Sequence, residues 1–185
     1  LSLRRQRQMC IRDSKETLQY GLISAAAAVL IFVVLYILGA EYFLSPAAWI
    51  SSYLLPIVFA VLGAIQVKKN NNGFLPFNEA LKITFGVLVI TALVSSIVSF
   101  LIFNYMDVAF AERMKQLTIE KSQETMQKFG VPEAEMEKAM DKLVEQDIFS
   151  LGSIAKSFAY ACILYFIEAL IISAIVKKKK PELEF

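Results

Sequence analysis

Four long apolar runs constrain the fold of this chain more than any other feature of its sequence. The runs cover residues 18–40, 47–67, 83–105 and 154–176. Because an α-helix rises 1.5 Å per residue, about 20 apolar residues are enough to cross a hydrocarbon core about 30 Å thick. Glu168 is the only formal charge within the runs, apart from Lys156 near the start of the fourth. The sequence therefore predicts an all-α polytopic membrane protein with four transmembrane helices.

The composition agrees with a bilayer environment rather than a large soluble core. The chain is 57% hydrophobic, whereas soluble domains are typically about 45–50% apolar. A signal peptide is the alternative for the first run, but the run is longer than the roughly 7–15 residue apolar core of such peptides.

The distribution of lysine and arginine predicts the orientation. Lys68 and Lys69 follow the second run and residues 177–180 are four lysines after the fourth, whereas the connection 41–46 contains no lysine or arginine. The positive-inside rule then places both termini in the cytoplasm and residues 106–151 outside. An outer aromatic belt is consistent with this orientation, and its members are Tyr42, Trp49, Tyr53 and Tyr105.

The insert between the third and fourth runs is charged but has helical periodicity. Gly130 and Pro132 are typical of a helix stop followed by a helix start. The pattern predicts a hairpin of two helices, 107–129 and 132–147, with the first helix continuous with the third span. The second helix carries an apolar stripe that we expect to be a partner surface, formed by Met136, Met140 and Leu143.

Glu168 is the candidate functional residue within the membrane. A carboxylate at this depth is costly, so it is expected to bind a proton or cation, or to form hydrogen bonds across helices. Its conceivable partners by depth are Tyr165, Ser24, Ser95 and Ser96. The alternative is a structural glutamate, protonated or reaching toward the interface, that faces another helix.

Small residues at helical spacing predict where the spans approach one another closely. These candidate packing residues are Ala60, Gly63 and Ala64 on the second span, Ser95 and Ser99 on the third, and Ala155 and Ala159 on the fourth.

Residues that usually support catalysis or metal binding are scarce in this sequence. The chain has no histidine, and Cys162 is the only cysteine beyond residue 13. It contains no phosphate-binding loop, nucleophile elbow, HExxH or paired-cysteine motif. The outer methionines offer Cu(I) ligands, but no M-x-x-M tandem accompanies them, and methionine is also an ordinary packing residue. We therefore expect no enzyme, no cofactor and no metal site.

Residues 1–13 resemble the translation of a sequencing adapter rather than part of a folded protein, and the single membrane domain is expected to cover 14–185. This leading segment holds Arg4, Arg5, Arg7, Arg12 and Asp13, a net charge of +3, so the remainder of the chain has a net charge of −1 instead of +2. We therefore expect no nucleic-acid partner. A basic nucleic-acid arm or the start of a signal peptide are the alternatives.

Several segments together resemble one bacterial membrane protein family, domain-of-unknown-function family 4199. They are YGLIS at 20–24, NNNGFLPFNEALKITFG at 70–86, GVPEAEMEKAM at 130–140, FSLGSIAKSF at 149–158 and IISAIVKKKKPELEF at 171–185. The resemblance implies four spans, an outer helical insert and the bacterial inner membrane. The family has no assigned activity, so it implies no catalytic residues. Its members begin with methionine and a short polar lead, which the leading segment replaces here.

The sequence favours a non-enzymatic membrane protein that assembles with envelope components, or with a second copy of itself, through the outer hairpin. The first alternative is a small transporter or channel subunit that uses Glu168. A membrane enzyme is the third. A pore would need polar faces on several spans, and only scattered serine and threonine accompany Glu168.

Overall fold

The computed structural model describes residues 2–178 of the chain, and the side chains of residues 14–178. Its elements, in chain order, are α1 (Ser2–Leu38), α2 (Ala40–Phe43), α3 (Pro46–Asn70), α4 (Phe77–Leu101), the π-helical segment η1 (Ile102–Met106), α5 (Val108–Lys128), α6 (Glu133–Glu145) and α7 (Leu151–Val176). Four helices are long and apolar enough to cross a membrane: 14–38 of α1, α3, α4 with η1, and α7. The prediction of an all-α protein with four spans is confirmed.

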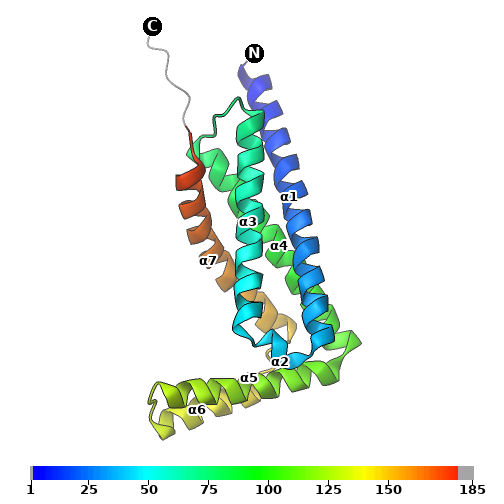
Figure 1. Cartoon of the computed structure of the whole chain (residues 1–185), viewed down its shortest axis with the longest axis vertical. Helices are drawn as coiled ribbons and strands as arrows, with labels where there is room; N and C mark the ends of the chain where they lie inside the picture. Colours follow the sequence, from blue (N-terminus) through cyan, green and yellow to red (C-terminus); the bar gives the residue numbers. More distant parts are fainter. Residues whose placement is uncertain (1, 179–185) are drawn as a thin grey trace.

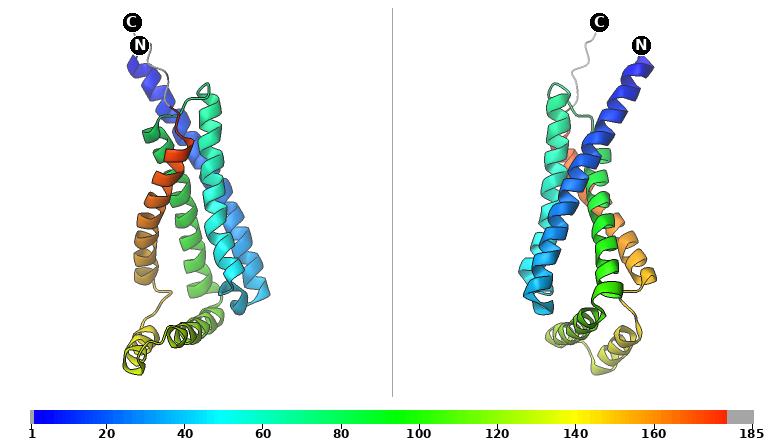
Figure 2. Two further views of the ribbon diagram at one scale, coloured as in Figure 1. Left: turned by 60° about the vertical axis from the view of Figure 1, so that its left-hand side comes forward. Right: turned by 90° about the vertical axis from the view of Figure 1, so that its right-hand side faces the viewer.

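The four spans form a bundle, and α5 and α6 lie side by side across one end of it (Figure 1). The two hairpin helices run at a steep angle to the spans and extend beyond the bundle (Figures 1 and 2). We call this the hairpin end, and the opposite end, with the α3–α4 connection, the loop end. Since α4 packs against α1, α3 and α7, it is the central helix of the bundle.

Small residues allow α1 to approach its neighbours closely. A Cβ atom added at Gly21 would lie 2.9 Å from Ile90 of α4, and one added at Gly86 of α4 would overlap the methyl group of Thr17. A Cβ atom on Gly63 of α3 would lie 3.3 Å from Tyr20. These contacts are of the kind that brings helix backbones together in a bilayer.

The contact between α4 and α7 is partly polar. The hydroxyl groups of Thr84 and Ser173 lie 3.0 Å apart in hydrogen-bond contact, and Thr84 is also 2.9 Å from the Ala80 carbonyl oxygen. Both hydroxyl-bearing residues are fully buried. Around them lies an apolar core that includes Ala60, Ala64, Val67, Ile83, Val87, Leu88 and Ala169.

The loop end fastens the end of α7 to the α3–α4 connection. Leu75 and Lys178 exchange two backbone hydrogen bonds, each 2.8 Å long, and Leu75 is fully buried. The Lys68 ammonium donates to the Val176 carbonyl oxygen at 2.7 Å, which satisfies a carbonyl group at the C-terminus of α7. Lys178 also lies over the ring of Phe74, at 5.8 Å from its centroid.

The prediction that the first hairpin helix continues the third span is wrong. The chain leaves the span through the wider turn of η1, and Asp107 then takes φ −147° and ψ 79°, which no helix allows. The new helix starts immediately afterwards, because the Asp107 side chain accepts a hydrogen bond from the Phe110 N–H at 2.8 Å. The hairpin therefore turns away from the axis of the span.

We predict that Gly86→Ala destabilises the fold by about 1–3 kcal/mol, the usual cost of overpacking. The added methyl group would overlap Thr17, whose branched side chain cannot easily move aside. Gly152→Ala is the matched control, since an added Cβ atom meets nothing within 4 Å there. Unfolding by titration from mild detergent into dodecyl sulfate measures the difference. Equal stability of the two variants would show that close packing at Gly86 is not required.

Candidate functional site

The root of the hairpin is attached to α1 by a hydrogen bond between side chains. The Tyr36 hydroxyl donates to one carboxylate oxygen of Asp107 at 2.6 Å, while the other oxygen caps α5 by accepting from Phe110. These two hydrogen bonds hold the pKa of Asp107 below its ordinary value of 3.8, with the larger effect from Tyr36. One carboxylate therefore joins a span to the first helix of the hairpin.

A second polar residue, Asn104, links the two segments through which the chain passes between the spans and the hairpin. The Asn104 amide donates to the carbonyl oxygen of Phe100 at 3.0 Å and to that of Phe149 at 2.9 Å. Phe149 lies in the connection between α6 and α7. The amide of Asn104, which lies in the π-helical turn, therefore connects η1 to the segment between α6 and α7.

An aromatic cluster surrounds these hydrogen bonds. The Phe103 ring is buried, and its centroid lies 4.5 Å from that of Phe149 and 5.7 Å from that of Phe32. Phe110 lies between Phe103 and Tyr36, with centroid distances of 6.1 and 4.7 Å. The cluster connects α1, η1, α5 and the α6–α7 connection, so the root of the hairpin is held from several sides.

The two hairpin helices pack together beyond the root. Lys115 of α5 donates to the Val144 carbonyl oxygen of α6 at 2.6 Å. The predicted partner residues Met136, Met140 and Leu143 are half-buried, whereas most residues between them are exposed. The stripe is therefore only partly available to another protein.

The most exposed large apolar side chain of the hairpin is Phe129, which sequence reasoning missed as a contact residue. It is 82% exposed and follows the last residue of α5. Gly130 comes next, with φ 69°, a conformation that favours glycine. The sequence did contain a signal for this residue, because Phe129 stands next to the turn of an otherwise charged hairpin. At such a tip no other part of the chain is expected to cover its ring.

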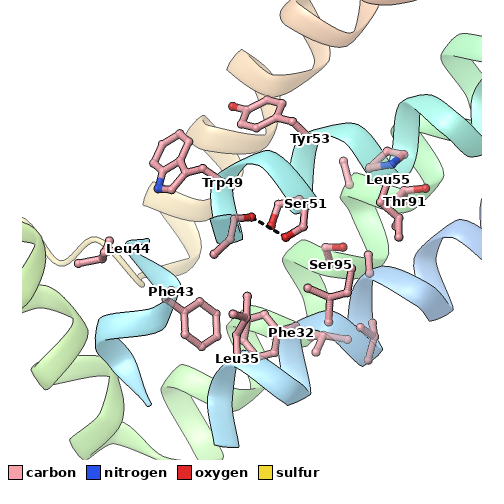
Figure 3. Close-up of a pocket in the computed structure, with 18 of the residues that line it drawn as sticks. Phe32, Leu35, Phe43, Leu44, Trp49, Ser51, Tyr53, Leu55, Thr91 and Ser95 are labelled. Atoms are coloured by element: carbon pink, nitrogen blue, oxygen red, sulfur yellow. Dashed lines mark hydrogen bonds between the residues drawn. The ribbon is translucent and has the colours of Figure 1, made fainter. Parts of the chain in front are cut away.

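A cavity of about 370 Å³ lies within the spans in the half of the bundle next to the hairpin. We call it the hairpin-end cavity (Figure 3). Its lining comes from α1 (Ala28, Val29, Ile31, Phe32, Leu35), α2 and the residue after it (Phe43, Leu44), α3 (Ala48, Trp49, Ser51, Ser52, Tyr53, Leu55, Pro56), α4 (Thr91, Ala92, Ser95, Val98), α5 (Met114) and α7 (Tyr165).

The lining of the cavity is mostly apolar. None of its lining residues carries a formal charge. The Ser51 hydroxyl donates to the Ala48 carbonyl oxygen at 2.9 Å, and the Thr91 hydroxyl donates to that of Val87, also at 2.9 Å. These two donors are therefore already used within their own helices. Of the residues predicted from the sequence, Ser95 lines the cavity directly and Ser96 does not.

Glu168 lies on α7, one helical turn from Tyr165 in the direction of the loop end. It is half-buried, and its carboxylate oxygen Oε2 is buried with no hydrogen-bond partner among the described residues. The Ser24 hydroxyl is likewise buried without a partner, but it belongs to α1, which does not pack against α7. The structure therefore does not bring Glu168 and Ser24 together, and Glu168 is not among the residues that line the cavity.

The predicted packing residues fall into two groups. Ala60, Gly63 and Ala64 are buried, in contact with the core or with Tyr20. Ser95 and Ser99 are half-buried, and Ala155 and Ala159 are exposed on the part of α7 nearest the hairpin. The last two residues therefore do not mediate a helix contact within the described part of the chain. The close contacts at Gly21 and Gly86 were not singled out from the sequence, although single glycines within apolar runs are a signal for them.

Comparison with known proteins finds one family. The model of a family described as a protein of unknown function (DUF4199) matches residues 19–178, which include all four spans and the hairpin. No curated protein and no solved structure matches the chain.

We predict that Asp107 makes stability depend on pH. Since its pKa is lowered in the folded state, the carboxylate stabilises the fold fully above its unfolded pKa, and this contribution is lost as the pH falls through the folded pKa. Asp107→Asn keeps an acceptor for the helix cap but removes the charge. The variant should melt below the parent at pH 7, and the difference should shrink below about pH 4.

Melting curves in detergent between pH 3 and 7 test this prediction. Glu112→Gln is the control, because it removes an exposed carboxylate from the same helix. A gap between parent and Asp107→Asn that stays constant across this range would contradict the role assigned to the charge.

Proposed function

This chain belongs to the DUF4199 family of proteins of unknown function, and we propose from its structure that it is a non-enzymatic membrane protein that assembles with an envelope protein through its hairpin. The observation that carries the proposal is an exposed aromatic tip on a hairpin whose root is held in place. Phe129 is 82% exposed, while Asp107 and Asn104 fasten the other end of the hairpin to the spans.

An exposed aromatic residue at such a tip is suited to binding a partner. Aromatic side chains bury a large area at little cost in side-chain entropy and dominate the energetics of many interfaces. The hairpin extends beyond the bundle, so its tip is not covered by the spans (Figure 1). Charged residues exposed along α5 and α6 would form the polar rim around such an anchor.

The same proposal includes an orientation. We infer that the hairpin faces the outside of a bacterial cytoplasmic membrane and that the loop end faces the cytoplasm. Lys68, Lys177 and Lys178 are all at the loop end, as the positive-inside rule requires. Trp49 and Tyr53 stack at the opposite end, with ring centroids 6.1 Å apart, where an interfacial aromatic belt is expected.

We expect benzoylphenylalanine at position 129 to crosslink to one discrete protein in native membranes under ultraviolet light. Position 160 is the matched control, because Tyr160 is an aromatic residue that is 71% exposed on a span. Crosslinks there should reach lipid. With the partner identified, Phe129→Ser should weaken its binding roughly 30-fold, the effect of losing an anchor worth about 2 kcal/mol.

The proposal fails if position 129 gives no protein adduct, or if Phe129→Ser binds the identified partner as tightly as the parent does. An adduct with a second copy of the chain would show that the hairpin binds another copy of this protein rather than a different envelope protein. Labelling of a cysteine at position 129 with an impermeant maleimide on spheroplasts, in a background without Cys10 and Cys162, tests the orientation separately.

Glu168 supports a second candidate function, a small transporter or channel subunit. Its Oε2 atom is buried within a span, and it has no hydrogen-bond partner in the described part of the chain. An ionised carboxylate is costly there, so the group would be neutral or would be paired with a bound cation. If this carboxylate binds and releases a proton, it would take part in proton movement across the membrane.

If Glu168 carries protons, proteoliposomes with an internal pH dye should acidify under an imposed potential, and Glu168→Gln should reduce the rate to that of protein-free liposomes. Glu112→Gln, outside the spans, should leave the rate unchanged. The same rate with and without the parent protein would eliminate proton transport, and equal rates for the parent and Glu168→Gln would remove this residue from it.

A further inference from the structure

We propose that the hairpin-end cavity holds one hydrocarbon chain of a lipid from the leaflet next to the hairpin. This inference does not depend on either proposed function. It rests on the depth, chemistry and access of the cavity.

The depth of the cavity matches one leaflet. On α3 its lining extends from Ala48 to Pro56, which corresponds to a rise of about 12 Å at 1.5 Å per residue. Half of a hydrocarbon core about 30 Å thick is about 15 Å. An acyl chain that enters beside the interface would therefore be accommodated over most of its leaflet.

The extent of the cavity argues against a transmembrane helix as its occupant. The lining covers a rise of about 12 Å on α3, whereas a helix that crosses the hydrocarbon core needs a groove about 30 Å long. A hydrocarbon chain from one leaflet needs only about half that length.

The lining favours hydrocarbon over water or a polar ligand. No charged side chain lines the cavity, and two of its hydroxyl groups, those of Ser51 and Thr91, donate to their own helices. The other hydroxyl-bearing lining residues are Ser52, Tyr53, Ser95 and Tyr165, and the remaining lining residues are apolar apart from Trp49. A buried water normally requires two to four polar partners, and apolar cavities stay dry or bind apolar ligands. Lipid chains are the apolar molecules that surround a membrane span at all times.

The lining residues at the hairpin end favour lateral access over access from the water. Phe43, Leu44 and Met114 close the hairpin end, and Met114 is only 7% exposed. Trp49 and Tyr53 lie on the other side, where they are 57% and 42% exposed. Figure 3 shows both rings on the opposite side of α3 from Phe32, Leu35 and Phe43.

The proposal places the lateral entrance between α3 and α7. These helices touch over a short stretch only, and Tyr165 of α7 contributes to the lining. Aromatic residues such as Trp49 and Tyr53 are typical of the headgroup region, so the polar part of the lipid would remain beside them while one chain extends inward.

A photoactivatable lipid tests the proposal. The protein is reconstituted in vesicles of phosphatidylethanolamine and phosphatidylglycerol that contain a small fraction of phosphatidylcholine with a mid-chain diazirine. After illumination, mass spectrometry should find adducts on inward residues such as Ala28 and Thr91. Ser95→Phe, which places a ring in the cavity, should reduce these adducts at least about tenfold. Ser96→Phe, the neighbouring serine outside the lining, should retain them.

Adducts on Leu30 and Leu93, which are 67% and 47% exposed, report ordinary lipid contact and should be the same in all variants. Ala92→Leu is a smaller filling change that serves if Ser95→Phe fails to fold. Adducts confined to such exposed residues in the parent, or inward adducts that the filling variants retain, would overturn the proposal. Benzoylphenylalanine in place of Ala92 should likewise crosslink to lipid, and a crosslink from this position to another protein chain would overturn the proposal as well.

Discussion

The close approach of α4 to the helices around it is the contact on which the rest of the structure depends. Lipid tails are as apolar as leucine, so spans associate through packing and hydrogen bonds rather than through the hydrophobic effect. Gly86 of α4 and Gly21 of α1 remove the side chains that would separate these two helices, and Thr84 joins α4 to Ser173 of α7. Because α1, α3 and α7 all pack on α4, these contacts set the position of each of these spans relative to the central helix.

The hairpin takes its direction from one residue at the end of this central span. Asp107 interrupts the helix, caps the next one and accepts a hydrogen bond from Tyr36 of α1. Asn104 and the aromatic rings around Phe103 then fix the returning connection. Since these contacts come from several elements, the hairpin is a lateral extension of the membrane domain rather than a tethered arm (Figure 2).

Three features are arranged in order along the bundle, each with its own chemistry. The exposed tip at Phe129 is outside the spans, the apolar cavity lies in the adjoining half, and Glu168 lies one turn beyond the cavity residue Tyr165. Met114 of α5 lines the cavity, so a change in the position of the hairpin would alter the closed end of the cavity. This contact physically connects the proposed partner site on the hairpin with the proposed lipid site in the spans.

The apolar length of each run determined the four spans, and helical periodicity together with Gly130 and Pro132 determined the two hairpin helices. Small residues four apart do not determine burial by themselves, because Ala60 and Ala64 are buried while Ala155 and Ala159 are exposed. Only the tertiary structure decided this difference, the bend at Asp107, the absence of a hydrogen-bond partner for Glu168 Oε2 among the described residues, and the cavity built from six parts of the chain. In water, an amphipathic pattern reveals which face of a helix is buried. Within a bilayer the lipid-facing and helix-facing sides are both apolar, so the sequence of a span does not show which neighbours it meets, and the angles between helices have to be known.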